Sequence, residues 1–411
     1  MIRITTSYRN IFYWACAAIL WTYMSVTIIN LYKSWYITTV FVCIFTGLLL
    51  FNNNIKTNGL VKSLGLILIY YSYLLLTAIW AEYPDVTIWF VATESIYVII
   101  FALFYLLSIN FAPDRIIDFF VYLVPPAILC FLITYIIDPE ASRFGGYVLV
   151  LLPFIFLFCV FRLIQSVSIL NIVFITACLL MLVTGRSRAP LIIAGFGLLL
   201  MFMTKTNPWR RLRKPILVFV MIGIVFIITI ITVPQLKLFA AQTIVRITYQ
   251  EMVVSDQVIE AEMPDEVRWR IYDDAFLLYK TNWLFGMGYM NFMPWFGDMY
   301  NFIDENPKGK ETVGMNLHNT FQTWALEGGL PCLCIVAMLL WKYFRILRRR
   351  IIQSNNDLEK SYYKLFVIGM VCSLVVGLFH QIHQTPMLFI LLGIVYALED
   401  NNKNNNVHPL P

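Results

Sequence analysis

A histidine stands at the point where a long polar segment of this sequence becomes apolar. It is His318, in "VGMNLHNTFQTWALEGGLPC" (residues 313–332). An imidazole titrates near neutral pH, so this side chain could accept a proton from a reacting hydroxyl group or donate a hydrogen bond to a phosphate. Asn319, the next residue, could help to bind an acceptor. The alternative is that His318 only caps or anchors the helix predicted to begin here.

Arginines at three separate places could bind a phosphate group. Arg143 occurs in "DPEASRFGGY", Arg186 and Arg188 occur in "VTGRSRAPL", and Arg268 and Arg270 occur in "VRWRIYDDAF". A guanidinium group stays charged and offers a fork of donors that matches phosphate oxygens. Each arginine taken alone could instead reach lipid headgroups or pair with an acid. Together they favour a site for a lipid-linked phosphate.

The arginines at 268 and 270 differ in their predicted surroundings. A proline followed by two acidic residues predicts that a helix starts at 264 and continues to about 279. Arg270 then has Glu266 four residues before it and Asp273 and Asp274 three and four residues after it, so intrahelical pairs should neutralise it. Arg268 has fewer acids nearby and is the better candidate for a substrate contact.

Further polar side chains lie within or beside apolar segments. His380 and His383 in "FHQIHQ" could line an acceptor site, whereas a metal would need another ligand that the sequence does not identify, so neither a metal nor a cofactor is expected. Glu94 is expensive to bury and favours a polar cavity or a partner, unless it is half exposed near the end of its span. "GMGYMNF" (286–292) is not a nucleotide-binding fingerprint, because no strand precedes it, and we interpret it as a flexible turn.

Membrane-spanning helices are needed to position these residues. Of the 411 residues, 60% are hydrophobic and 13% are charged, which excludes an ordinary soluble domain. Apolar runs predict an all-α integral membrane protein with about twelve spans. The predicted spans are 11–31, 36–51, 64–81, 86–111, 116–137, 147–164, 167–184, 189–204, 215–234, 328–344, 362–380 and 386–398.

The Lys and Arg residues are distributed unevenly between the two sides of this bundle. "KTNPWRRLRKP" (205–215) and "WKYFRILRRR" (341–350) fall on one side, which the positive-inside rule makes cytoplasmic. We interpret both clusters as topology signals beside anionic lipid and not as a nucleic-acid site. The predicted organisation is an N-terminal bundle (1–234), a periplasmic or extracellular loop domain (235–327), C-terminal helices (328–398) and a disordered cytoplasmic tail (399–411).

Four segments occur in an order that resembles a known family. They are "TGRSRAPLIIAGFGLLL" (184–200), "VRWRIYDDAF", "FGMGYMNF" and "LHNTFQTWALEGGLPC". In this order they are similar to the O-antigen ligase and polymerase superfamily of bacterial surface-polysaccharide enzymes. The resemblance implies a GT-C-like fold, an outward loop before the tenth span and an arginine-rich pocket for undecaprenyl diphosphate. It assigns the family's Ser-Arg motif to Ser187 and Arg188, its loop-helix arginine to Arg268 and its histidine to His318.

The activity implied by the resemblance is glycan transfer at the outer face of the bacterial inner membrane. The donor would be a glycan on undecaprenyl diphosphate, and the acceptor would be the lipid A core for a ligase or a lipid-linked repeat for a polymerase. Arginines would stabilise the diphosphate without a metal, since no Asp-x-Asp motif occurs in the sequence. The compact insert favours the ligase. A transporter or flippase is the alternative of another class, but no internal repeat supports it.

The predicted orientation can be tested by cysteine labelling. In a background without the native cysteines, Asn301→Cys should react with an impermeant thiol reagent on intact spheroplasts, because the insert is predicted to face outward. Ser354→Cys, in a predicted cytoplasmic loop, should react only after lysis. The reverse pattern would place the insert in the cytoplasm.

Overall fold

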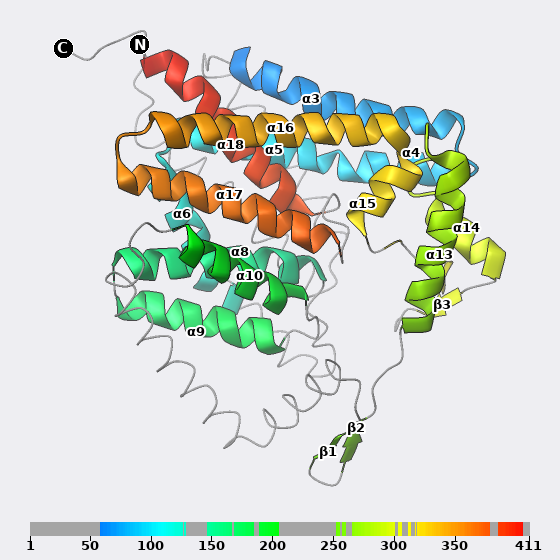
Figure 1. Ribbon diagram of the computed structural model, residues 1–411, viewed down its shortest axis with the longest axis horizontal. Coiled ribbons are helices and arrows are strands. Elements are labelled where there is room, and N and C mark those ends of the chain that lie inside the picture. The colour runs from blue at the N-terminus through cyan, green and yellow to red at the C-terminus, as the bar shows by residue number, and fades with distance from the viewer. Residues whose placement is uncertain are drawn as a thin grey trace. The chain divides into compact units, whose positions relative to one another are not determined.

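The computed structural model shows a helical membrane protein (Figure 1). It describes residues 58–125, 127–128, 146–166, 168–184, 189–204, 252–254, 257–259, 265–300, 303–305, 311–313, 317, 319–378 and 385–405. The expected spans 11–31, 36–51 and 215–234 lie outside these residues, and 116–137 is described only in part. Helices occupy the other expected spans.

Several described helices are long and apolar enough to cross a bilayer. They are Gly59–Ile79, Pro84–Ile109, Gly329–Gln353 and Asp357–Gly377. Shorter apolar helices cover Leu151–Gln165, Ile169–Leu182, Pro190–Met203 and Pro386–Glu399. These lengths and compositions support an integral membrane protein.

The chain divides into two compact units, and the first contains most of the described residues. It comprises Met1–Ile19, Tyr36–Ile116 and Val267–Pro411. Its membrane helices are α3 (Asn58–Leu76) with the 3₁₀ turn η1 (Thr77–Ile79), α4 (Pro84–Glu94), α5 (Ile96–Asn110), α16 (Gly329–Gln353), α17 (Asp357–Gly377) and α18 (Pro386–Asn405). Between α5 and α16 in sequence come α13 (Asp265–Asn282), α14 (Phe292–Tyr300), strands β3 (Ile303–Glu305) and β4 (Glu311–Val313), α15 (Thr320–Gln322) and the π-helix η2 (Thr323–Glu327).

Helices α4 and α5 form one span that is interrupted near its middle. Pro84 occupies the first turn of α4, where its missing N–H costs nothing. The interruption falls at Ser95, whose hydroxyl donates to the carbonyl of Ala92 (2.6 Å) and competes with the regular helical bonds. Glu94, directly before it, is therefore inside the span and buried.

Helix α18 forms the centre of this unit. Its residues from Met387 to Leu398 are buried, as expected of a helix that is apolar on every side. It packs along α5, where the rings of Phe389 and Tyr97 stack at 5.3 Å. The helix continues to Asn405, past the predicted start of the disordered tail at 399, because the end of a packed helix can extend into polar sequence.

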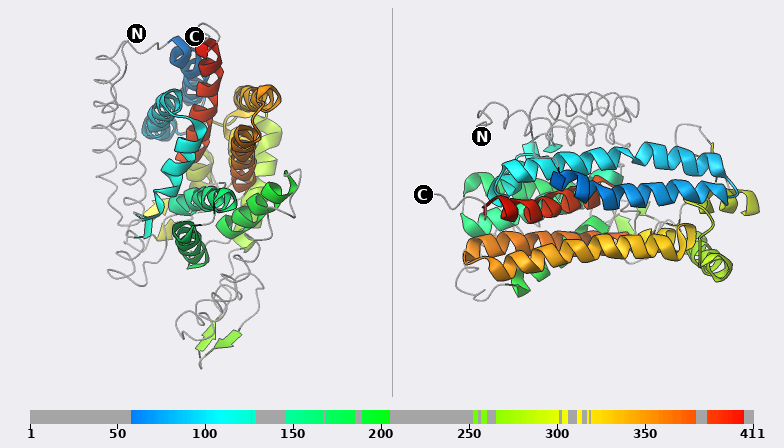
Figure 2. Two further views of the ribbon diagram at one scale, coloured as in Figure 1. Left: turned by 90° about the vertical axis from the view of Figure 1, so that its left-hand side faces the viewer. Right: turned by 90° about the horizontal axis from the view of Figure 1, so that it is seen from above.

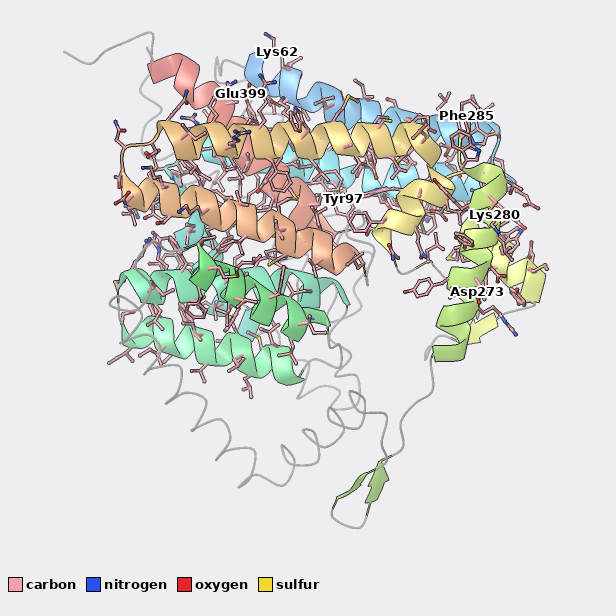
Figure 3. All side chains as sticks on the ribbon, in the orientation of Figure 1. Lys62, Tyr97, Asp273, Lys280, Phe285 and Glu399 are labelled. Atoms are coloured by element: carbon pink, nitrogen blue, oxygen red, sulfur yellow. The ribbon has the colours of Figure 1, made fainter. Side chains whose placement is uncertain are left out.

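Helices α16 and α17 form a hairpin beside α3. Asn356 caps α17, and its side chain accepts a hydrogen bond from the N–H of Leu358 (2.9 Å). Figure 3 places Lys62 and Glu399 at one end of these helices and Phe285 at the other. The arginine-rich end of α16 is the end away from Phe285.

The second unit comprises Leu20–Trp35 and Ile117–Glu266. Its described helices are α6 (Pro113–Val121, which begins just before the unit), α8 (Gly146–Gln165), α9 (Ile169–Thr184) and α10 (Ala189–Met203), and strands β1 (Met252–Val254) and β2 (Gln257–Ile259) form an antiparallel hairpin. Arg162 of α8 pairs with Asp118 of α6 at 2.6 Å. This ion pair joins two helices that are otherwise packed through apolar side chains.

Within the first unit, α13 runs across the ends of the membrane helices. Figure 1 shows α3, α16 and α17 along one direction and α13 nearly at right angles to them, and the second view of Figure 2 agrees. The helix begins at Asp265, as predicted from the acidic residues after Pro264, and ends at Asn282. A pair of short strands, β3 and β4, completes the polar insert.

The close packing of α5 on α18 depends on Gly393. A Cβ atom there would lie 2.5 Å from the carbonyl oxygen of Phe101, so Gly393→Ala should push the helices apart and cost about 1–3 kcal/mol. Gly65→Ala in α3 is the matched control, because a Cβ atom there meets nothing within 4 Å. Thermal unfolding in detergent should show a lower midpoint for Gly393→Ala alone. Equal midpoints for both variants would mean that this contact does not limit stability.

Candidate functional site

Few of the predicted site residues have described side chains. Those outside the described residues are Arg143, Arg186, Arg188, His318, His380 and His383. Arg268 lies in the first turn of α13, where the structure describes the backbone. Glu94, Arg270 and Asn319 have described side chains, and each one is engaged in a specific contact.

Asn319 caps the short helix α15. Its side-chain oxygen accepts hydrogen bonds from the N–H groups of Phe321 (3.0 Å) and Gln322 (3.2 Å). The predicted helix start after His318 is therefore confirmed, and the capping side chain at this start is that of Asn319. This cap fixes the backbone immediately after residue 318.

Arg270 contacts an aromatic ring instead of the predicted acids. Its guanidinium carbon lies 5.0 Å from the ring centre of Tyr300 in α14. Among the described side chains, no ion pair joins it to Asp273 or Asp274. The predicted pairs with Asp273 and Asp274 are therefore wrong, and Asp274 hydrogen-bonds to Tyr300 instead. The side chain of Glu266, the third predicted partner, lies outside the described part of the chain. Arg270 is exposed and helps to hold α13 against α14.

Glu94 binds a tyrosine that the sequence analysis did not single out. The hydroxyl of Tyr289 donates to Oε2 of Glu94 at 2.6 Å, and both residues are buried. The half-exposed position considered for Glu94 is therefore wrong, because α4 turns this side chain toward the segment 285–292. The expectation of a partner for the buried carboxylate is fulfilled by Tyr289.

The segment 286–292, interpreted from sequence as a flexible turn, is instead buried and held by hydrogen bonds. Tyr289 donates its N–H to the hydroxyl of Thr77 (3.0 Å) and accepts at its carbonyl from the hydroxyl of Thr87 (2.7 Å). The Asn291 side chain accepts from the N–H of Tyr83 (2.6 Å) and donates to Thr87 (2.8 Å). The flexible-turn interpretation is wrong because residues far away in sequence supply these partners.

Glu327 holds the same segment from its other side. Its two carboxylate oxygens accept the backbone N–H groups of Met290 and Phe292, both at 3.0 Å. Burial raises the pKa of the Glu327 carboxyl to about 8, while the two N–H donors act to lower it. The unfolded chain loses this proton near pH 4.5, whereas the folded protein keeps it up to about pH 8. The stability that the proton gives to the folded state is therefore lost as the pH rises through about 8.

Glycines allow the backbone at Gly286 to lie directly against the backbone at Glu327 and Gly329. Gly286 and Gly329 have φ angles of +78° and +66°, which favour glycine. A Cβ atom on Gly286 would overlap the carbonyl oxygen of Glu327, and one on Gly329 would lie 2.5 Å from the nitrogen of Gly286. The glycines of "FGMG" and "EGG" were thus the sequence signal for a rigid junction.

An apolar cluster brings the chain around residue 318 onto α13. Leu317 is buried together with Ile271 and Ala275 of α13 and with Leu326 of η2. Ile271 lies three residues after Arg268, which is about one helical turn. Leu317, on one side of residue 318, therefore shares an apolar cluster with the helix whose first turn contains Arg268, and Asn319, on the other side, caps α15.

The Glu327 contact can be tested by its removal. Glu327→Ala leaves two buried N–H groups without their carboxylate acceptor and should lower stability by about 1–3 kcal/mol for each group. Glu82→Ala, which removes an exposed carboxylate, is the control. The difference in unfolding temperature between the wild type and Glu327→Ala should narrow as the pH rises through about 8. A difference that widens over this range would contradict the raised pKa.

A comparison with known protein families finds a match to part of the chain. The model of the O-antigen ligase family matches residues 172–337, a range that includes most of α9 and all of α10, α13, the segment 285–292 and α15. A search of curated proteins gives no match. The match contains Arg186, Arg188, Arg268 and His318, which were predicted to contact the substrate. The chain is therefore similar to the O-antigen ligase family over residues 172–337, and this match confirms the predicted resemblance to the O-antigen ligase and polymerase superfamily.

Proposed function

We propose that this protein transfers a glycan from undecaprenyl diphosphate to an acceptor sugar at the outer face of the cytoplasmic membrane. The family match supports an activity of the O-antigen ligase or polymerase type. Within that class we favour the ligase, which uses the lipid A core as acceptor, because the insert is compact. The proposal includes about twelve spans, with residues 235–327 facing the periplasm or exterior.

The observation that carries this proposal is the packing of Leu317 on α13. Leu317 is buried in the same apolar cluster as Ile271, which follows Arg268 by about one helical turn, and Asn319 caps α15 on the other side of residue 318. We assign a catalytic role to Arg268 and His318 on this ground and on the family resemblance. Arg143, Arg186 and Arg188 are proposed to bind the diphosphate.

The proposed reaction needs charge stabilisation and one proton transfer. The bond between the anomeric carbon of the glycan and the diphosphate oxygen breaks, and a bond from that carbon to the acceptor oxygen forms. The acceptor hydroxyl gives its proton to His318. The leaving undecaprenyl diphosphate keeps the electron pair of the broken bond, and the arginines stabilise its negative charge. The proposal requires no metal for these steps.

Glu94 and Arg270 have smaller roles in this proposal than the sequence suggested. Glu94 is occupied by Tyr289 and supports the segment 286–292, so we assign it to the surroundings of the site. Arg270 lies over Tyr300 and is proposed to position α13 more than to bind phosphate. His380 and His383 remain proposed for the acceptor side.

Alanine variants test the proposed roles. Arg268→Ala and His318→Ala should each lower transfer by roughly 10²–10⁴-fold at unchanged protein level, the range expected for a positioned catalytic group. Arg270→Ala should have a milder effect. Arg348→Ala, an exposed arginine at the opposite end of α16, is the control and should keep full activity. Equal and mild losses at 268, 318 and 348 would contradict a shared site.

The surface glycan of a deletion strain separates the alternatives. Loss of a ligase leaves long glycan on the polyprenol carrier and none on the lipid A core, whereas loss of a polymerase leaves the core with a single repeat. Electrophoresis of the glycan, after complementation with wild type or His318→Ala, distinguishes these outcomes. A ladder of normal length and amount in the deletion strain would contradict both transferase assignments.

A further inference from the structure

The end of α13 and the turn after it expose large apolar side chains. We call this surface the α13 tip, and it consists of Phe276, Leu277, Trp283, Leu284 and Phe285. Phe276 is 63% exposed and Phe285 is 58% exposed. A cluster of exposed aromatic and aliphatic side chains at one place marks an interaction surface. The α13 tip has no role in the proposed chemistry, so it needs a partner of its own.

Hydrogen bonds fix the α13 tip at the ends of two membrane spans. The N–H of Leu330, the second residue of the span Gly329–Gln353, donates to the carbonyls of Trp283 and Leu284, both at 3.1 Å. Trp80, which follows the span Gly59–Ile79, donates its ring N–H to the carbonyl of Gly286 (3.2 Å). The tip is thus held where these two spans leave the bilayer.

The apolar surface continues from the tip onto the lipid-facing side of α3. The rings of Phe285 and Trp80 lie 6.0 Å apart. Next to Trp80, the exposed apolar residues Leu75, Leu76 and Ile79 end the span of α3. Exposed apolar side chains therefore continue from the tip to the end of α3.

Polarity changes along the exposed side of α13. Figure 3 shows Phe285 at the end of α13 that meets the spans, Lys280 further along it and Asp273 beyond. The Lys280 ammonium lies 4.9 Å from the ring centre of Phe276, so its aliphatic chain covers apolar surface while its charge stays outside. Lysine and tryptophan together are typical of the layer between headgroups and acyl chains.

We propose that the α13 tip is inserted into the lipid headgroup layer and anchors α13 to the membrane surface. Continuity with the lipid-facing side of α3 favours lipid as the partner. Because α13 runs nearly at right angles to the spans (Figure 1), the anchored helix lies along the membrane surface. Phe276 is eight residues from Arg268, or about 12 Å along the helix. If the proposed function holds, the anchor keeps Arg268 at the depth of a lipid-linked diphosphate.

Spin labels can measure this depth in the full-length protein in phospholipid vesicles. Leu284→Cys and Met299→Cys, in a background without native cysteines, would each carry a nitroxide; Met299 is exposed on α14, which lies further from the spans than α13 (Figure 1). At 284, collisions with oxygen, which concentrates in lipid, should exceed those with a water-soluble nickel complex, and at 299 the order should reverse. Nickel collisions that dominate at both positions overturn the proposal. Few collisions with either reagent at 284 would overturn it too, since a protein partner would then cover the tip.

A second measurement needs no cysteine removal. The emission of Trp283 is obtained as the difference between wild type and Trp283→Phe. Lipids brominated near the headgroup should quench this difference more strongly than lipids brominated near the acyl-chain end. Absence of quenching by either lipid overturns the anchor. Both measurements are independent of glycan transfer, so a failure of the anchor and a failure of the proposed function can be told apart.

Discussion

The hydrogen bonds from Met290 and Phe292 to the Glu327 carboxylate join the segment 286–292 to the π-helix η2. Residues 286 and 288–292 are buried and Met287 is half-buried, so the polar backbone groups of this segment need partners within the protein. Glu327 supplies two of these partners. A buried carboxyl that accepts two N–H groups loses much of its hydration, and its raised pKa reports that cost.

The remaining partners come from the N-terminal spans of the same unit. Thr77, Thr87 and Glu94 are about two hundred positions away from Tyr289 in sequence, yet each one forms a hydrogen bond with it. The segment therefore acts as a junction between α3–α4 and α15–α16. Because α13 ends directly before this junction, its direction across the spans follows from the same set of contacts.

Sequence patterns were informative where one local rule decided the structure. Apolar runs located the described membrane helices, and the acidic turn after Pro264 predicted the start of α13. Sequence patterns did not predict side-chain contacts whose partners are distant in sequence. The partner of Arg270 is Tyr300 on another helix, and that of Glu94 is Tyr289, so neither contact could be inferred from intrahelical spacing. Residue chemistry and helix spacing suggested His318 and Arg268, and the family pattern added their roles, because isolated polar residues define no geometry by themselves.

The π-helix η2 has a consequence for how related sequences should be aligned. Its wide turn, closed by the bond from the N–H of Gly328 to the carbonyl of Thr323, holds one residue more than an α-helical turn. Such a turn arises when a single residue is inserted into a regular helix. A relative without that residue would have an unbroken α-helix and a shorter spacing between its histidine and its paired glycines. Searches for this motif should therefore permit a gap of one residue between positions 319 and 328.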